Sequence, residues 1–273
     1  MKTLCDTRVE TIDRQAEPLS RVLDQFEATG LDEMNAVRLL DRTETKFVLR
    51  EEQALAALVQ LAGRYRVLDI DGQRASHYQT LYFDTPDWLL FRQHHAGAGT
   101  RYKVRSRAYV ESHLSFLEVK RKHPATRRTV KNRRFTPALL AGLDGAAQDF
   151  VHGFCPLDAG RLEARLGNTF TRVTLVSTVC CERLTLDFDI RFQTDQAASS
   201  LRGLVIAEVK QERLTRGSDW MRVMRALRTR PAGFSKYCVG VTLLCPEVKS
   251  NHFKPKLLLI ERLLQERRVR GYH

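Results

Sequence analysis

Several short segments of this sequence alternate strictly between charged and apolar side chains, and this pattern constrains the fold more than any other feature. From Arg183 to Phe192 the odd positions are Arg, Thr, Asp, Asp and Arg, and the even positions are Leu, Leu, Phe, Ile and Phe. Successive side chains of a β-strand point to opposite faces, so a period of two predicts a strand with one charged and one apolar face.

The same alternation, or a high content of β-branched and aromatic residues, predicts further strands along the chain. The expected strands are residues 42–49, 77–84, 101–109, 114–122, 128–135, 170–179, 182–192 and 204–211. Apolar residues at helical spacing predict helices over 51–62, 219–230 and 255–268, and the Gly- and Ala-rich stretch 138–167 is expected to form helices and loop. Many strands with few long helices indicate an α+β protein.

Two arrangements would accommodate the charged strand faces. An antiparallel sheet can expose its charged face to water. Alternatively, a closed antiparallel β-barrel of about eight strands would gather the charges in a shared interior, with the apolar faces outside under the helices. Like charges repel in a poorly solvated interior, so this interior would have to hold water, metal and anions. The density of the pattern favours the barrel, which is the fold that we predict.

The charge of the chain indicates an acidic partner. A formal charge of +13 and a pI near 9.8 fit nucleic acid, an anionic membrane surface or small molecules that carry phosphate. Seven of the 11 lysines lie in or beside the alternating segments, and a lysine is a compact point charge suited to a multivalent anion. No apolar run is long enough to span a membrane and no signal peptide opens the chain, so a cytoplasmic protein is expected.

Other features of the sequence set the expected organisation. We expect a helical lead-in over 1–37, the main domain over 38–246 and a basic helical tail over 247–273 that packs against the body rather than on a membrane. The six cysteines form no C-x-x-C motif and are expected to be reduced, with Cys180 and Cys181 side by side on a strand. No P-loop motif occurs, and His94 and His95 are expected to be a surface pair.

Several motifs, in order, resemble one known family. They are R-x-E-x-K-F at 42–47, H-Y-Q-T-L-Y-F-D at 77–84, K-V-R-S-R-A-Y at 103–109, F-L-E-V-K at 116–120, V-K-N-R at 130–133, R-L-T-L-D at 183–187, A-E-V-K at 207–210 and F-S-K-Y-C at 234–238. Together they make residues 37–245 similar to the catalytic domain of the vacuolar transporter chaperone (VTC) family, a polyphosphate polymerase domain within the triphosphate tunnel metalloenzymes.

The resemblance implies a tunnel in which the γ-phosphate of ATP, or another nucleoside triphosphate, is transferred to polyphosphate or pyrophosphate. It implies phosphate contacts from Lys46, Arg105, Arg107, Lys120, Lys131, Arg133, Arg172, Arg183, Lys210 and Lys236. Within this set, Arg105, Arg107, Lys120 and Lys131 would bind the nucleotide, and Lys210 and Lys236 would lie deeper in the tunnel. Glu208 is the first expected ligand for Mg²⁺ or Mn²⁺, followed by Glu44 and Glu118.

Two departures from the wider group modify this expectation. Arg42 stands where hydrolytic and cyclase members carry the first glutamate of E-x-E-x-K, which favours transfer to a phosphate acceptor over hydrolysis. The eukaryotic polymerase subunits also carry a regulatory domain and a membrane segment, so any coupling to a membrane is expected to run through a membrane-protein partner.

Two alternatives stay open. A tunnel triphosphatase would hydrolyse tripolyphosphate or nucleotides without chain growth. A binding module would hold polyphosphate, or nucleic acid, without chemistry. Specific nucleic-acid binding is not expected, because Glu118 and Glu208 alternate with the cations and would repel a phosphate backbone. The roles of Asp187 and Asp189 also stay open, between binding metal and pairing with cations.

Overall fold

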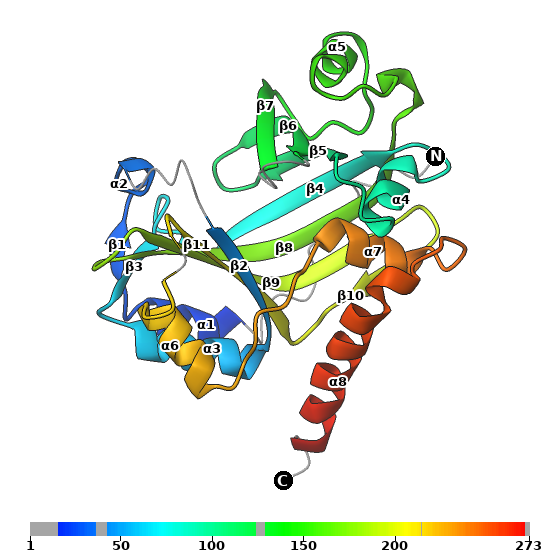
Figure 1. Ribbon diagram of the computed structural model, residues 1–273. Coiled ribbons are helices and arrows are strands. Elements are labelled where there is room, and N and C mark those ends of the chain that lie inside the picture. Colours follow the sequence, from blue (N-terminus) through cyan, green and yellow to red (C-terminus); the bar gives the residue numbers. More distant parts are fainter. Residues whose placement is uncertain (1–15, 37–42, 124–128, 214, 271–273) are drawn as a thin grey trace.

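One large curved sheet organises the protein (Figure 1). The computed structural model describes residues 16–36, 43–123, 129–213 and 215–270. The strands are β1 (Glu27–Thr29), β2 (Thr43–Arg50), β3 (Tyr65–Leu68), β4 (Ser76–Asp84), β5 (Arg101–Tyr109), β6 (Leu114–Lys122), β7 (Thr129–Thr136), β8 (Glu163–Ser177), β9 (Glu182–Gln193), β10 (Ala198–Ser200) and β11 (Leu204–Gln211). The helices are α1 (Ala16–Leu23), α2 (Leu31–Ala36), α3 (Glu51–Leu61), α4 (Leu89–His95), α5 (Gly145–Phe154), α6 (Asp219–Ala226), α7 (Lys236–Leu244) and α8 (Lys254–Arg270).

The strand order is β2-β11-β9-β8-β4-β5-β6-β7, and neighbouring strands on this path are antiparallel. The α+β class and the antiparallel sheet are therefore as predicted. The closed barrel is not: over the described residues the hydrogen-bonded path ends at β2 and at β7. β7 is an edge strand with no further strand beside it among the described residues, and its Val130 and Phe135 are 46% and 58% exposed.

The predicted strands agree closely with the observed ones except at the start of β8, and the short strands β1, β3 and β10 were not predicted. β8 begins at Glu163 rather than at residue 170, because its first half carries Gly167 and polar residues that hide the alternation. Cys180 and Cys181 lie in the turn between β8 and β9, both exposed, and not on a strand. Arg42, expected on β2, lies outside the described residues.

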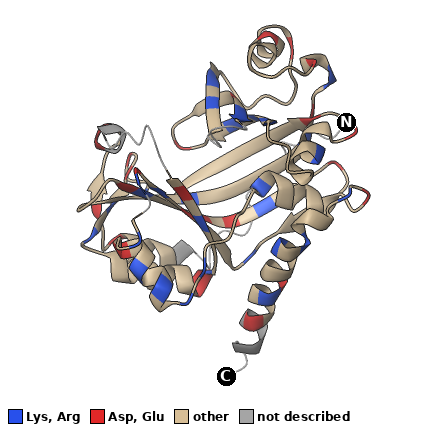
Figure 2. Cartoon of the chain, viewed as in Figure 1, with Lys and Arg blue, Asp and Glu red and all other residues tan. Residues whose placement is uncertain are grey.

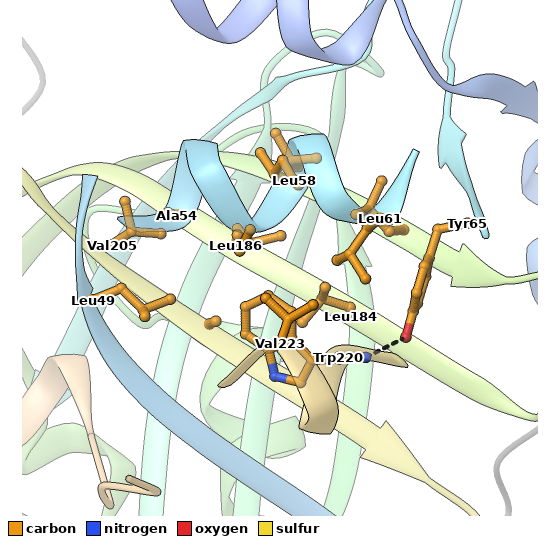
Figure 3. Packing of buried hydrophobic residues seen from close by; sticks show 14 of the residues in the cluster. Leu49, Ala54, Leu58, Leu61, Tyr65, Leu184, Leu186, Val205, Trp220 and Val223 are labelled. Atoms are coloured by element: carbon orange, nitrogen blue, oxygen red, sulfur yellow. Dashed lines mark hydrogen bonds between the residues drawn. The ribbon is translucent and has the colours of Figure 1, made fainter. Parts of the chain in front are cut away.

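The apolar faces of the strands point outward under helices, as predicted. One cluster packs α1, α3 and α6 against β2, β9 and β11, with Trp220 fully buried beside Leu184 and Leu186 (Figure 3). A second cluster on the other half of the sheet joins Val104 and Leu117 to Val151 of α5. Burying these faces leaves the opposite, inner face of the same strands for the charged residues.

A bulge on β9 changes which residues reach the inner face. Pairing with β8 shifts register opposite Thr169 to Thr171, and Asp189 has a left-handed φ of 48°. The extra residue reverses the alternation. Phe188 therefore packs on the outer face with Leu184 and Leu186, whereas Ile190 and Phe192 pack on the inner face. The sequence pattern, which placed Asp187 and Asp189 on one face, is wrong beyond this point: Asp187 is buried and Asp189 is exposed.

Helix α7 packs across the inner face at the end beyond the bulge. Its Tyr237, Cys238 and Val241 join Phe192 in a third apolar cluster. Gly240 permits the close approach, since a Cβ there would lie 2.7 Å from side-chain carbons of Leu166 and Phe192. The contact fixes the N-terminus of α7, and with it Lys236, beside the charged part of the sheet.

The tail helix α8 packs against the body, as expected. Ile260 and Leu263 are buried in the cluster around α7, and Arg50 of β2 forms an ion pair with Glu266. α1 of the lead-in is likewise part of the outer core through Leu23. None of the helices in the described ranges is long and apolar enough to cross a membrane.

His94 differs from the expected surface pair, and the difference predicts an acid-sensitive stability. Its Nε2–H donates to the carbonyl oxygen of Tyr102 at 3.1 Å, and burial together with nearby Lys103 lowers the pKa of His94 to about 3. The unfolded state, with an ordinary pKa near 6.5, binds this proton more readily. The contribution of neutral His94 to the free energy of unfolding is therefore complete above pH 6.5 and is lost as the pH falls towards 3.

We expect His94→Gln to weaken the pH dependence of the free energy of unfolding between pH 6.5 and 4. Urea denaturation across this range measures it. His95→Gln, at the adjacent histidine of α4, is the control for the substitution itself. Equal slopes in wild type and His94→Gln would contradict the assignment.

Candidate functional site

The inner face of the sheet carries the predicted site residues. Strand register aligns them in rows, since residues directly opposite in an antiparallel pair share a face. One row runs through Tyr82, Arg105, Glu118 and Arg133. Every predicted phosphate ligand lies on this face or reaches it from α7: Lys46, Arg105, Arg107, Lys120, Lys131, Arg133, Arg172, Arg183, Lys210 and Lys236. In Figure 2 the β6–β7 hairpin carries several of the blue Lys and Arg positions.

On the β2–β11 side, one carboxylate lies between two lysines. Glu208 forms ion pairs with Lys46 and, at 2.6 Å, with Lys210. Lys46 also lies 3.5 Å from Glu44. Burial opposes ionisation of Glu208, but the two lysines hold its pKa well below the usual range. Both Glu208 and Lys46 keep about a fifth of their side-chain surface exposed, so a ligand can reach them.

In the centre, Asp187 holds two cations in place. Arg172 donates to its two carboxylate oxygens at 2.6 and 2.8 Å, and Lys236 of α7 forms an ion pair with it. Burial would raise the pKa of Asp187, but these cations lower it well below its usual range. Lys236 also lies 4.4 Å from the centre of the Phe170 ring. The sequence leaves Asp187 between metal binding and pairing, and the structure shows the pairing.

On the β5–β6–β7 side, Glu118 fixes Arg105. Its carboxylate is fully buried, accepts from Nε of Arg105 at 2.6 Å and lies 3.3 Å from Nζ of Lys131. Lys120, two residues further along β6, has no recorded ion pair among the described residues. Repulsion from Arg105, added to burial, holds the pKa of Lys120 well below its usual range.

Arg107 is a buried cation without a carboxylate partner in the described structure. It is 6% exposed, and its Nε donates to Oγ1 of Thr80 at 3.0 Å. Its guanidinium lies 5.5 Å from the ring centres of both Tyr78 and Phe170. Burial and the neighbouring Arg105 lower the pKa of Arg107, so the ligand-free protein holds this charge at a cost.

The inner face as a whole has an excess of positive charge, and this charge changes the pKa of the buried Tyr82 phenol. Burial opposes ionisation of Tyr82, yet Arg105, Arg107 and Lys103 lower its pKa. Crowding cations without carboxylate partners on a half-buried face costs free energy through repulsion and desolvation, and a bound anion reduces this cost. The arrangement therefore suits a ligand with several negative charges, such as a chain of phosphates.

Some residues of the site were missing from the predicted set. Lys103 donates to Oγ of Ser235 at 2.8 Å, and Ser235 caps the N-terminus of α7 through the amide of Cys238. Tyr237, expected only to pack, also forms a hydrogen bond with the buried Asp84. The K-V-R-S-R, Y-F-D and F-S-K-Y-C motifs contained these residues, but only the fold shows that α7 reaches the sheet at this point.

The three predicted metal ligands do not come together. Glu44 and Glu208 share Lys46, whereas Glu118 is enclosed by Arg105 and Lys131 on another part of the sheet. The described residues contain no group of three or more metal-binding side chains. Hard divalent cations take oxygen ligands, including those of a bound triphosphate, so Glu44 and Glu208 fit such an ion better than Glu118 does.

Comparison with known proteins gives one family match and several distant structures. Three solved structures are similar over most of their own length. A protein from Bacillus halodurans proposed to be an adenylate cyclase is 13% identical, with 71% of this chain and 94% of that chain covered and a TM-score of 0.46. A protein from Vibrio parahaemolyticus with the same proposed activity is 15% identical, with coverage of 71% and 94% and a TM-score of 0.42.

The third, a Hippeastrum protein proposed to be an adenylyl cyclase and described as having a dominant triphosphatase activity, is 15% identical, with coverage of 73% and 94% and a TM-score of 0.44. All three structural similarities are distant, with TM-scores below 0.5. No curated protein matches the chain. The family model of the VTC domain matches residues 41–140, which run from just before β2 to just beyond β7. Over these residues the resemblance seen in the sequence is confirmed.

Proposed function

We propose that this protein is a metal-dependent polyphosphate polymerase that transfers the γ-phosphate of ATP, or of another nucleoside triphosphate, to a polyphosphate or pyrophosphate acceptor. The observation that carries the proposal is Arg107, a buried cation surrounded by other cations and without a carboxylate partner in the described structure. A bound phosphate chain would supply the missing negative charge. The VTC domain match over residues 41–140 includes β5, which carries Arg107, and supports the proposed activity.

The cations of the site divide into two groups: those without a carboxylate partner and those oriented by a buried carboxylate. Arg107, Lys120 and Arg133 have no recorded carboxylate partner within the described ranges and would contact the triphosphate directly. Arg105 and Arg172 are oriented by buried carboxylates and would present their remaining N–H groups. Phosphoryl transfer requires mainly positioning and the neutralisation of charge on the phosphate oxygens, which fixed cations provide.

The other predicted ligands fit the acceptor side of the same face. Lys46 and Lys210 lie on β2 and β11, and Lys236 of α7 contacts Asp187 of β9, so all three lie away from the β6–β7 hairpin. Glu208, with Glu44, would hold Mg²⁺ or Mn²⁺, which would neutralise phosphate charge and polarise the reacting phosphoryl group. We assign Glu118 to positioning Arg105 instead. ATP is a cytoplasmic donor, in keeping with the location expected from the sequence.

A second candidate is a tunnel triphosphatase. Lys131 and Arg133 lie on β7, an exposed edge strand, so water can approach the bound phosphates from this side. The same cations would then stabilise attack by water on the γ-phosphate, and phosphate would be released without chain growth.

One experiment separates the candidates. Purified protein is incubated with γ-labelled ATP and Mg²⁺ or Mn²⁺, with and without a short polyphosphate primer, and the products are resolved by length on a gel. We expect a ladder of lengthening chains that is lost in Arg105→Ala. Orthophosphate alone would identify a triphosphatase. Tight polyphosphate binding without turnover would identify a binding module and overturn the proposal.

A further inference from the structure

Five aromatic side chains form an unbroken row across the inner face, beside the phosphate-binding cations. Phe170 of β8 stacks on Tyr78 of β4, with ring centres 5.0 Å apart and an interplanar angle of 17°. Tyr78 contacts Tyr109 of β5 at 4.9 Å, and Tyr109 contacts Phe116 of β6 at 5.9 Å. Phe116 in turn contacts Phe135 of β7 at 5.9 Å.

The exposure of the row increases from one end to the other. Phe170 is 3% exposed, whereas Phe135 at the edge strand is 58% exposed. A ring of this size normally packs in a core or an interface. Among the described residues, the ring contact of Phe135 is edge-on, to Phe116 at an interplanar angle of 81°.

Cations accompany the row along its length. Arg107 and Arg172 lie over Tyr78, and the guanidinium of Arg133 lies 4.8 Å from the centre of the Phe116 ring. On β7 itself, Lys131, Arg133 and Phe135 occupy alternate positions of one face. Alternate residues of a strand are separated by about 6.8 Å, so a basic side chain stands one step from the exposed ring and another two steps away.

We propose that the exposed end of this row, Phe135 with Phe116, is the stacking platform for the base of the nucleoside triphosphate. The inference rests on the proposed function. It adds where the base of the nucleotide binds and that stacking is the interaction that recognises it. A molecule with a planar ring at one end and a chain of negative charges at the other matches the order Phe135, Arg133, Lys131. Polyphosphate, which has no ring, matches only the cations.

The platform also defines the class of donor. Stacking uses the face of the base, which all bases present, and no described hydrogen-bonding side chain is needed for it. The site therefore accepts ATP and GTP with similar affinity, and purines, having the larger ring system, bind more tightly than pyrimidines.

Comparing ATP with tripolyphosphate tests the platform, because the two share the phosphate chain and differ in the base. We expect Phe135→Ala to weaken ATP binding about tenfold, the loss of one stacking interaction. Tripolyphosphate binding should be unchanged, and Phe135→Trp should restore ATP binding and show fluorescence quenching by ATP. Isothermal titration of the full chain with each ligand gives both affinities. Val130→Ala, at the other exposed apolar residue of β7, is the matched control and should bind both ligands as the wild type does.

The outcomes distinguish a failed platform from a failed function. Unchanged ATP affinity in Phe135→Ala, or an equal loss for ATP and tripolyphosphate, would overturn the platform while leaving the phosphate site intact. Failure of the wild type to bind either ligand would overturn the proposed function, and with it this inference.

Discussion

Replacing Arg107 by methionine is expected to abolish activity and, at the same time, to raise the melting temperature of the ligand-free protein. Arg107 is buried beside Arg105 and Arg172, which, together with burial, lower its pKa. Its charge therefore destabilises the folded state, and a neutral side chain of similar length relieves this cost. Without Arg107 the transferred phosphate loses a preorganised cation, which is worth on the order of 10² to 10³ in turnover.

The matched control is Arg105→Met, two residues along the same strand face. Arg105 forms an ion pair with Glu118, which is fully buried. Replacing Arg105 therefore leaves the Glu118 carboxylate paired with Lys131 alone among the described residues. We expect a cost of about 3 kcal/mol and a melting temperature lower by roughly 6 to 12 °C. Both variants should lose turnover, but their stabilities should change in opposite directions.

Differential scanning calorimetry without ligand, together with the chain-growth assay, measures both effects. The exposed Arg121→Ala on β6 should change neither turnover nor stability. A lowered melting temperature in Arg107→Met, or retained turnover, would show that Arg107 is a structural residue and not the site of the phosphate.

Replacing Glu208 is expected to have the second large effect. Glu208→Ala should remove metal-dependent turnover, by on the order of 10³-fold, because the stabilisation that a metal ion provides amounts to several kcal/mol. The protein should stay folded, since the side chain keeps 20% of its surface exposed and is not part of an apolar cluster.

A second measurement separates metal binding from the role of Glu208 as a partner of lysines. Lys46 and Lys210 are both paired with Glu208. In the presence of EDTA, Glu208→Ala should bind tripolyphosphate more tightly than the wild type does, because two lysines are released and one negative charge is removed. Glu44→Gln should show the same trend more weakly. Full activity of Glu208→Ala at all Mg²⁺ and Mn²⁺ concentrations would rule out the metal assignment.

Much of the site was predictable from the sequence because a strand has a period of two. The alternation in β5 and β6 places Arg105, Arg107, Glu118 and Lys120 on one face from local spacing alone, and antiparallel register then aligns the rows. The boundaries of β5, β6 and β11 were predicted to the residue for the same reason.

Interactions between distant segments could not be predicted in this way. The bulge at Asp189 depends on the pairing of β8 with β9, and it separates Asp187 from Asp189 although their spacing is that of one face. The position of Lys236 depends on α7, which contacts the sheet through Gly240. Local spacing also could not tell which of the candidate metal ligands lie together: Glu208 and Glu44 share Lys46, whereas Glu118 lies on another part of the sheet beside Arg105.

The sequence by itself determined the local features of this protein: strands with one charged and one apolar face, the helices that cover the apolar faces, and the excess of cations on the other side. These follow from the geometry of single strands and helices, whose period the side chains must match. The tertiary structure alone decided that the sheet stays open at β2 and β7, that Glu118 serves Arg105, and that Arg107 has no carboxylate partner among the described residues. Such features depend on which strands become neighbours and on how closely they pack, and contacts between residues far apart in the chain set both.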